Sequence, residues 1–253
     1  MERKVANISE ISEPGSATIR DMAPQIDKMS EIHHFSKTEL DQLKILYQGS
    51  PHHNLLKVFR ELRTRVYSQA KEGNFVCMIT SAVPKGGSSH VTRNLAAAIA
   101  LDRTRSALIV DANFYSPGME NIIVTDSDLG LTDYLDNPGL GVESIVYASG
   151  IPRVRVVPAG SNTEGATEKL ATERMYGLIN ELRSRYPDRY ILVDAPSAGE
   201  FNAEARLMAE FCDFALLVVP SGMVTDAALN TAIEALGEDK IAAYVFNNAK
   251  SEP

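Results

Sequence analysis

The amino-acid sequence predicts an α/β fold with three layers, in which helices cover both faces of a mainly parallel central sheet. From Phe75 onward, segments that are apolar at every position alternate with segments of helical periodicity. Strands that are apolar throughout are typical of parallel sheets, because both faces of such a sheet are buried. A glycine-containing loop joins the first of these strands directly to a helix, as in folds that bind ligands at the carboxyl ends of their strands.

The region before the sheet is expected to form an N-terminal extension, residues 1–49, ahead of a single domain, residues 50–253. Residues 1 to about 35 are polar and predict a flexible tail. Residues 35–47 predict a short docking helix, with Ser36 or Thr38 available as its cap. A second helix is predicted over residues 54–70, with Leu55, Val58, Phe59, Leu62 and Val66 on its apolar side.

The domain itself is predicted to alternate strands and helices. The expected strands are 75–81, 106–112, 154–158, 190–195, 214–220 and 241–247. The expected helices between them are 91–101, 143–147, 172–186, 203–210 and 225–236.

The loop after the first strand has the setting of a phosphate-binding loop (P-loop). Residues 81–96 read SAVPKGGSSHVTRNLA, between an apolar strand and a helix. In a working P-loop, backbone N–H groups and the helix N-terminus hold the phosphates, and one lysine neutralises them. The expected ending is Gly-Lys-Ser/Thr, but here it is Gly87, Ser88 and Ser89. A hydroxyl therefore stands where the ammonium group should be.

Two further strands end in aspartate. Residues 108–117 read LIVDANFYSP and residues 191–196 read ILVDAP, which places Asp111 and Asp194 at strand ends. P-loop enzymes use such aspartates to hold Mg²⁺ or its waters. The alternative is a structural role, in which these carboxylates accept hydrogen bonds from the loop backbone.

These segments, together with KVFRELRTRV at residues 57–66, resemble the cytoplasmic P-loop domain of the bacterial tyrosine kinases (BY-kinases) that control exopolysaccharide and capsule synthesis. The resemblance runs from about Ser50 to Asn248. The family pattern is an E-x-x-R-x-x-R oligomerisation helix, a Walker A loop of P-G-x-G-K-S/T, a Walker A′ motif of apolar-D-x-D-x-R and a Walker B motif of apolar-D-S/T-P. The resemblance implies a P-loop NTPase-like three-layer fold.

The chain departs from this pattern at most catalytic positions. In the Walker A loop, Pro84 and Ser89 keep their places, whereas Lys85 replaces a glycine and Ser88 replaces the lysine. The other departures are Asn113 for the second Walker A′ aspartate, Tyr115 for its arginine, Ala195 for the Walker B Ser/Thr, and Lys57 for the helix glutamate. Asp111, Asp194, Pro196, Arg60 and Arg63 persist.

The departures predict weak nucleotide chemistry. Losing a charge-assisted phosphate contact costs about 1.5–3 kcal/mol of binding, and asparagine is a poor proton acceptor and metal ligand. ATP or ADP with Mg²⁺ is therefore expected to bind weakly, if at all. The resemblance places the phosphate contacts at Pro84, Gly86, Gly87, Ser88 and Ser89, and Lys85 and His90 are added as candidate nucleotide contacts by their position and chemistry. The resemblance also implies metal contacts at Ser89, Asp111 and Asp194, remnant catalytic roles for Asp111 and Asp194, and a subunit interface at Arg60 and Arg63.

Lys85 and His90 each have a second interpretation. Lys85 either reaches phosphate as a point charge or is a solvated surface lysine. His90, at the first turn of the loop helix, either contacts an anion or caps and packs the helix.

Charge and composition limit the partners. A net charge of −8 argues against a general nucleic-acid binder. No apolar run approaches the ~18 residues of a membrane span, and there is no signal-peptide core. The expected location is the cytoplasm, with contact to the inner membrane only through a partner. Cys77 and Cys212 lie in apolar segments and are expected to be buried thiols.

Three functions fit the sequence. The favoured one is a catalytically degenerate BY-kinase homologue that serves a membrane polysaccharide co-polymerase, or a homologous BY-kinase domain, as a docking or regulatory partner. The second is an active ATP-dependent tyrosine autokinase that regulates polysaccharide chain length. The third is a positioning ATPase like ParA or MinD, whose signature lysine would fall at Val83 here.

Overall fold

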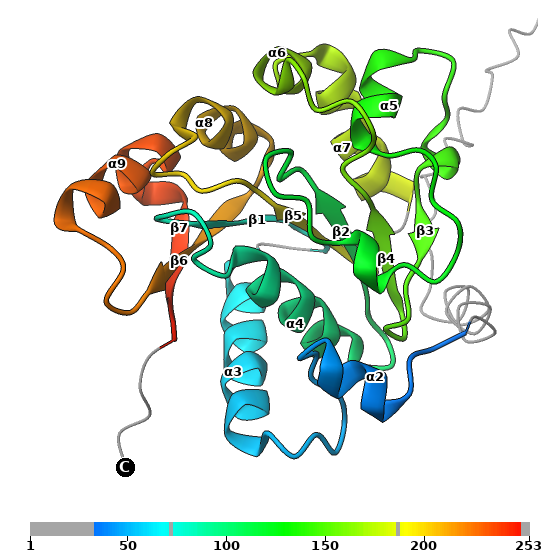
Figure 1. The fold of residues 1–253 in the computed structure, drawn as a ribbon, viewed down its shortest axis with the longest axis vertical. Helices are drawn as coiled ribbons and strands as arrows, with labels where there is room; N and C mark the ends of the chain where they lie inside the picture. The colour runs from blue at the N-terminus through cyan, green and yellow to red at the C-terminus, as the bar shows by residue number, and fades with distance from the viewer. Residues whose placement is uncertain (1–32, 71–72, 186–187, 249–253) are drawn as a thin grey trace, which may run out of the picture.

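A seven-stranded sheet forms the centre of the protein. The computed structural model describes residues 33–70, 73–185 and 188–248 (Figure 1), so the predicted flexible tail over residues 1–32 lies outside the described residues. The strand order is β3-β4-β2-β5-β1-β6-β7, and every pair is parallel except β3 with β4. The strands are β1 (Val76–Ser81), β2 (Ser106–Asp111), β3 (Tyr147–Ala148), β4 (Val154–Val157), β5 (Arg189–Asp194), β6 (Phe214–Pro220) and β7 (Ile241–Asn247).

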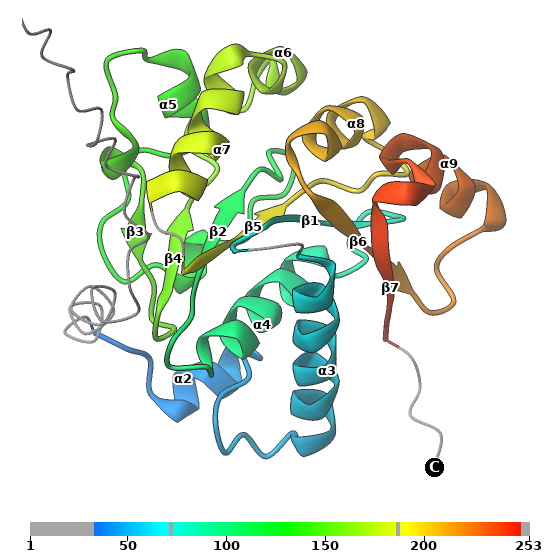
Figure 2. The same ribbon diagram turned by 180° about the vertical axis from the view of Figure 1, so that it is seen from behind.

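Helices cover both faces of the sheet, as the sequence predicts. One layer holds α2 (Lys37–Gln42), α3 (His53–Gln69) and α4 (Ser88–Ala100). The layer on the other face of the sheet, which Figure 2 also shows in a view of the molecule from behind, holds α5 (Leu131–Asp136), α6 (Ala166–Leu170), α7 (Glu173–Arg185), α8 (Asn202–Phe211) and α9 (Asp226–Leu236). Three-residue 3₁₀ turns lie at Glu120–Ile122, Val142–Ser144 and Glu238–Lys240. The three-layer α/β fold is confirmed, and Cys77 and Cys212 are buried free thiols.

One predicted helix is wrong. The segment 143–147 forms the 3₁₀ turn Val142–Ser144 and then β3, which pairs antiparallel with β4 through Tyr147 opposite Val156. Five residues are too few for an isolated helix to offset its nucleation cost. Pairing instead satisfies the backbone at the edge of β4.

The apolar face of α3 differs from the predicted one. Leu56, Phe59 and Val66 are buried, whereas Leu55 is 39% and Val58 55% exposed. The buried positions follow the spacing i, i+3 and i+10, which places them on the side of α3 that packs against α4. The predicted stripe therefore mixed two faces of the helix.

The segment before α3 packs on the domain. The predicted helix over 35–47 is the shorter α2, which Ser36 caps through a capping box with Glu39. After α2 the chain turns at Lys44 (φ 54°) and buries Ile45 and Leu46 in the core on the α4 side of the sheet.

Asn94 of α4 anchors this segment, residues 35–50, which we call the N-terminal arm. Its side-chain oxygen accepts a 2.8 Å hydrogen bond from the Leu46 backbone N–H, and its amide nitrogen donates to the Lys44 carbonyl at 3.0 Å. Asn94 is fully buried, and its hydrogen bond to the Leu46 N–H is shielded from water. The arm is therefore a packed part of the fold.

Candidate nucleotide and metal site

The P-loop connects β1 to α4 in the expected place. Two of its residues, Lys85 (φ 57°) and Gly87 (φ 97°), have left-handed backbone conformations. A Cβ added to Gly86 would lie 2.7 Å from the Cβ of Ser81, so the turn requires glycine there. The Lys85 side chain is exposed and Pro84 is exposed beside it.

Ser88 and Ser89 begin α4. Ser88 is 6% exposed, and its carbonyl accepts a hydrogen bond from the Thr92 hydroxyl at 2.9 Å. The Ser89 hydroxyl donates to Oδ2 of Asp194 at 2.6 Å, and the Thr92 hydroxyl donates to Oδ1 of the same carboxylate at 3.3 Å. The first turn of α4 is thus tied to the end of β5 by hydroxyl groups.

Asp111 and Asp194 are direct partners in the ladder between β2 and β5. Both are 0% exposed. Burial, and then the charge of Asp111, raise the pKa of Asp194 to about 8, and burial raises the pKa of Asp111 to about 6. Ionising both of two adjacent buried carboxylates is energetically unfavourable, because the two negative charges repel each other and neither is hydrated. This pair therefore favours binding of either protons or a cation.

Asp111 also organises the loop that follows β2. Its Oδ2 accepts hydrogen bonds from the backbone N–H groups of Gly118 (2.9 Å) and Met119 (3.0 Å), and its Oδ1 accepts one from Asn113 (3.2 Å). A Cβ on Gly118 would lie 3.5 Å from that of Ser89, so the loop packs on the start of α4. Asp111 therefore has the structural role considered above while it faces Asp194.

Tyr115, at the position of the family's arginine, is fixed away from a phosphate-binding role. Its ring stacks on Phe201 with centroids 3.7 Å apart, and its hydroxyl donates to Glu204 of α8 at 2.7 Å. The Thr167 hydroxyl donates to the same Glu204 oxygen at 2.5 Å. This contact joins the loop after β2 to α6 and α8.

Two residues at the site were not predicted from the sequence. Arg93 lies one turn after Ser89 on α4. Burial lowers the pKa of Arg93, and the charges of Asp194 and Asp111 act in the opposite direction. Its Nη1 donates to Asn121 at 3.2 Å, while its buried Nε has no hydrogen-bond partner. The spacing of four residues from Ser89 is the signal that could have identified it.

The second site residue that was not predicted from the sequence is Asn247, at the carboxyl end of β7. Its amide donates to the Gly86 carbonyl at 2.9 Å, and a Cβ on Gly87 would come within 2.2 Å of the same nitrogen. Parallel strands end at one edge of the sheet, so a polar residue that ends β7 could have been expected near the P-loop.

His90 and the two interface arginines lie elsewhere. The His90 ring packs edge-on against Phe59 at 6.4 Å and lies 3.3 Å from the Asn94 amide, so it faces α3 and the arm. Burial lowers the pKa of His90. Arg63 donates to the Ala98 carbonyl at 2.7 Å, inside its own chain, whereas Arg60 is exposed.

The site fits a divalent cation better than it fits a triphosphate. The Ser89 hydroxyl and two carboxylates are a ligand set that Mg²⁺ accepts when phosphates and water complete its shell. Only two of these ligands are carboxylates, and the described residues hold no group of three or more His, Cys, Asp or Glu side chains able to bind a metal. A triphosphate fits less well, because Ser88 supplies no positive charge and the Asn247 side chain lies against the loop glycines Gly86 and Gly87. Bound Mg²⁺-ATP would supply a transferable phosphoryl group; this chain supplies the oxygen ligands and the loop backbone.

The β1–loop–α4 connection and the paired strand-end aspartates define a P-loop domain. Comparison with known proteins extends this assignment. The chain is 28% identical to the putative tyrosine-protein kinase EpsB of Ralstonia solanacearum over 175 residues, which are 69% of this chain and 23% of EpsB. It is 26% identical to the tyrosine-protein kinase YwqD of Bacillus subtilis over 195 residues, 76% of this chain and 80% of YwqD.

A third relative is the succinoglycan biosynthesis transport protein ExoP of Rhizobium meliloti, 29% identical over 164 residues, 60% of this chain and 20% of ExoP. The chain is therefore a homologue of bacterial tyrosine-protein kinases, and it spans about a fifth of the length of EpsB and ExoP. No protein-family model matches it.

Solved structures agree on the fold. The chimerical protein CapA2B2 superposes with a TM-score of 0.70 at 19% identity, over 85% of this chain and 100% of that one. The BceF tyrosine kinase domain superposes with a TM-score of 0.69 at 23% identity, over 92% and 90% of the two chains. A cell-division ATPase MinD of Pyrococcus furiosus superposes with a TM-score of 0.57 at 24% identity, over 72% of this chain and 74% of that one.

Proposed function

We propose that the chain is a catalytically degenerate BY-kinase homologue that acts in exopolysaccharide biosynthesis as a cytoplasmic docking or regulatory partner of a membrane polysaccharide co-polymerase. Two kinds of relative support the pathway: tyrosine-protein kinases such as EpsB, and ExoP, which is named for succinoglycan biosynthesis and transport. Across residues 33–70, 73–185 and 188–248, no helix is long and apolar enough to cross a membrane. In this proposal the chain contacts the membrane through the co-polymerase.

The observation that carries the proposal is Ser88 at the buried start of α4. The lysine that would neutralise the phosphates is replaced by Ser88, a residue that is 6% exposed. Lys85 is the nearest lysine in sequence, but it lies in the left-handed turn with an exposed side chain. Removing that cation weakens ground-state binding, and it weakens a phosphoryl-transfer transition state further because charge moves there.

Retained metal ligands favour one alternative, an active tyrosine autokinase. Ser89, Asp111 and Asp194 still converge, and Arg93 brings a guanidinium group to the same end of α4. In that function Arg93 would do the work of the missing lysine. A ParA/MinD-like ATPase has no further observation in its favour, because the MinD likeness concerns the fold alone.

Partner docking can be tested on the exposed side of α3. Arg60 is the better probe of the two interface arginines, because Arg63 holds the Ala98 carbonyl at the end of α4 and its loss would destabilise the domain. Lys57 pairs with Glu61 in the same helix at 3.8 Å and presents a positive charge beside Arg60. A symmetric ring built on this face would bring like charges together, so a mixed complex with a co-polymerase or a homologous BY-kinase domain is expected.

We expect Arg60→Glu to abolish co-purification with the cytoplasmic part of the co-polymerase from the same organism, and to leave the thermal unfolding midpoint unchanged. Arg65→Glu, which changes another exposed arginine of α3, is the matched control and should retain the complex. Light scattering on the isolated chain should show no homo-octamer. A complex that survives Arg60→Glu, or a stable homo-octamer, would contradict this docking mode.

A further inference from the structure

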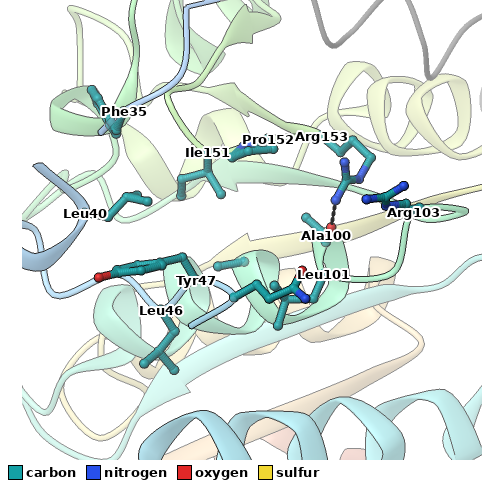
Figure 3. A pocket seen from close by; sticks show the side chains of 12 residues that line it. Phe35, Leu40, Leu46, Tyr47, Ala100, Leu101, Arg103, Ile151, Pro152 and Arg153 are labelled. Carbon is teal, nitrogen blue, oxygen red and sulfur yellow. Dashed lines mark hydrogen bonds between the residues drawn. The ribbon is translucent and has the colours of Figure 1, made fainter. Parts of the chain in front are cut away.

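A pocket of about 260 Å³ lies between the N-terminal arm and the C-terminal end of α4 (Figure 3), whereas the P-loop precedes the N-terminal end of that helix. The arm contributes Phe35, Leu40, Leu46 and Tyr47, and the turn before β4 contributes Ile151 and Pro152. The arm is held in place here by the Phe35 N–H, which donates to the Gly150 carbonyl at 2.9 Å. The walls are thus mostly apolar, and the arm is tied by its backbone to the turn before β4.

Two arginines lie at one end of this pocket. The guanidinium of Arg153 donates to the Ala100 carbonyl at the end of α4, and its buried Nε has no hydrogen-bond partner. Arg103 is exposed, and within the described part of the chain no acidic side chain forms a salt bridge with it. Burial, and next the charge of Arg103, lower the pKa of Arg153, so the two cations lie close enough to repel each other.

One acidic side chain, Asp102, lies near these arginines, and its charge acts on the pKa of Arg153 against the charge of Arg103. Asp102 accepts hydrogen bonds from the Thr104 N–H (2.9 Å) and hydroxyl (2.8 Å). Asp41 accepts one from the Tyr47 hydroxyl (3.2 Å), which points away from the two arginines (Figure 3). In a chain of net charge −8, two arginines and one aspartate beside an apolar pocket leave a local excess of positive charge. An anion with a neighbouring apolar group would satisfy both features at once.

The size of the pocket decides what kind of ligand this is. Pockets for cofactors and drug-sized molecules usually exceed about 300 Å³, so 260 Å³ suits one large side chain better than a whole cofactor. We propose that the pocket binds a partner peptide in which an aromatic or large aliphatic residue lies next to carboxylates, with the apolar side chain between the arm and α4 and the carboxylates on Arg103 and Arg153. This rests on the docking role proposed above and assigns it a second surface, distinct from α3.

The test is fluorescence anisotropy with the full chain and a labelled peptide that carries one phenylalanine next to two glutamates in a glycine–serine background. We expect saturable binding that weakens as salt is added. Arg103→Glu should weaken it at least about tenfold, because one cation becomes an anion, and Leu101→Trp should block the pocket. Arg65→Glu, outside the pocket, is the control, and thermal melts establish that each variant is folded.

Several outcomes would overturn the assignment. The pocket assignment would be wrong if the peptide did not bind at concentrations up to about 1 mM. It would also be wrong if a peptide with lysines in place of the glutamates bound equally well, or if neither pocket variant changed the affinity. Phosphatidylglycerol vesicles that bind the chain through Arg103, with no peptide binding, would identify a lipid surface instead. A dimer that Arg103→Glu converts to a monomer would identify a second copy. If the peptide fails while the co-polymerase still co-purifies, only the pocket assignment falls.

Discussion

Replacing Asp194 with asparagine is expected to stabilise the protein at about pH 8 and to change its stability little near pH 4. The folded-state pKa of Asp194 is about 8, far above the ordinary value of 3.8. Between these values the folded state holds a proton that the unfolded state has released. The free energy of unfolding therefore falls as pH rises, by up to about 1.4 kcal/mol per pH unit for one proton, and asparagine removes this dependence because it does not titrate.

Urea unfolding across this pH range measures the effect. The control is Asp239→Asn, which neutralises an exposed carboxylate and should leave the pH profile unchanged. A profile for Asp194→Asn that runs parallel to that of the unaltered protein would show that Asp194 is ionised in the folded state, and the buried-pair account of the site would then be wrong.

Asn94→Ala is expected to lower the free energy of unfolding by about 1–3 kcal/mol, because two backbone groups of the arm, one in a buried and one in a part-buried hydrogen bond, lose their partners. Those groups are the Leu46 N–H and the Lys44 carbonyl. Trypsin should then cut faster after Lys44, since the arm would separate from α4 more often. Asn180→Ala, an exposed helix position on the opposite layer, is the control. Equal stability and equal cleavage in the two variants would contradict the role of Asn94 as an anchor.

The sheet and its strand-end aspartates were predictable because they depend on local signals. Continuous apolar segments mark β1, β2 and β5, and the parallel geometry then brings Asp111 and Asp194 together. The face of α3 was less predictable, since Leu55 and Leu56 are equally apolar and only packing on α4 selects Leu56. The position of the arm depends on Asn94, whose contacts reach about 50 residues back along the chain.

Arg93 and Asn247 escaped prediction for a related reason. Each belongs to an element that was predicted, but neither lies in a recognised motif, and their role follows from where α4 and β7 end in space. The substitutions at Ser88, Asn113 and Tyr115 were visible in the sequence. The structure adds that Tyr115 is committed to Phe201 and Glu204, so it does not leave an open position for a substitute cation.

The central claim is that Ser88 leaves the P-loop without the charge that phosphoryl transfer needs. The most direct measurement is incubation of the purified chain with Mg²⁺ and radiolabelled ATP, together with calorimetric titration of ATP into the unaltered chain and into Ser88→Lys. We predict no phosphotyrosine, an ATP dissociation constant above about 1 mM, and affinity at least about tenfold higher in Ser88→Lys. Robust tyrosine phosphorylation of the unaltered chain that Asp111→Ala abolishes would contradict the account and establish an active kinase.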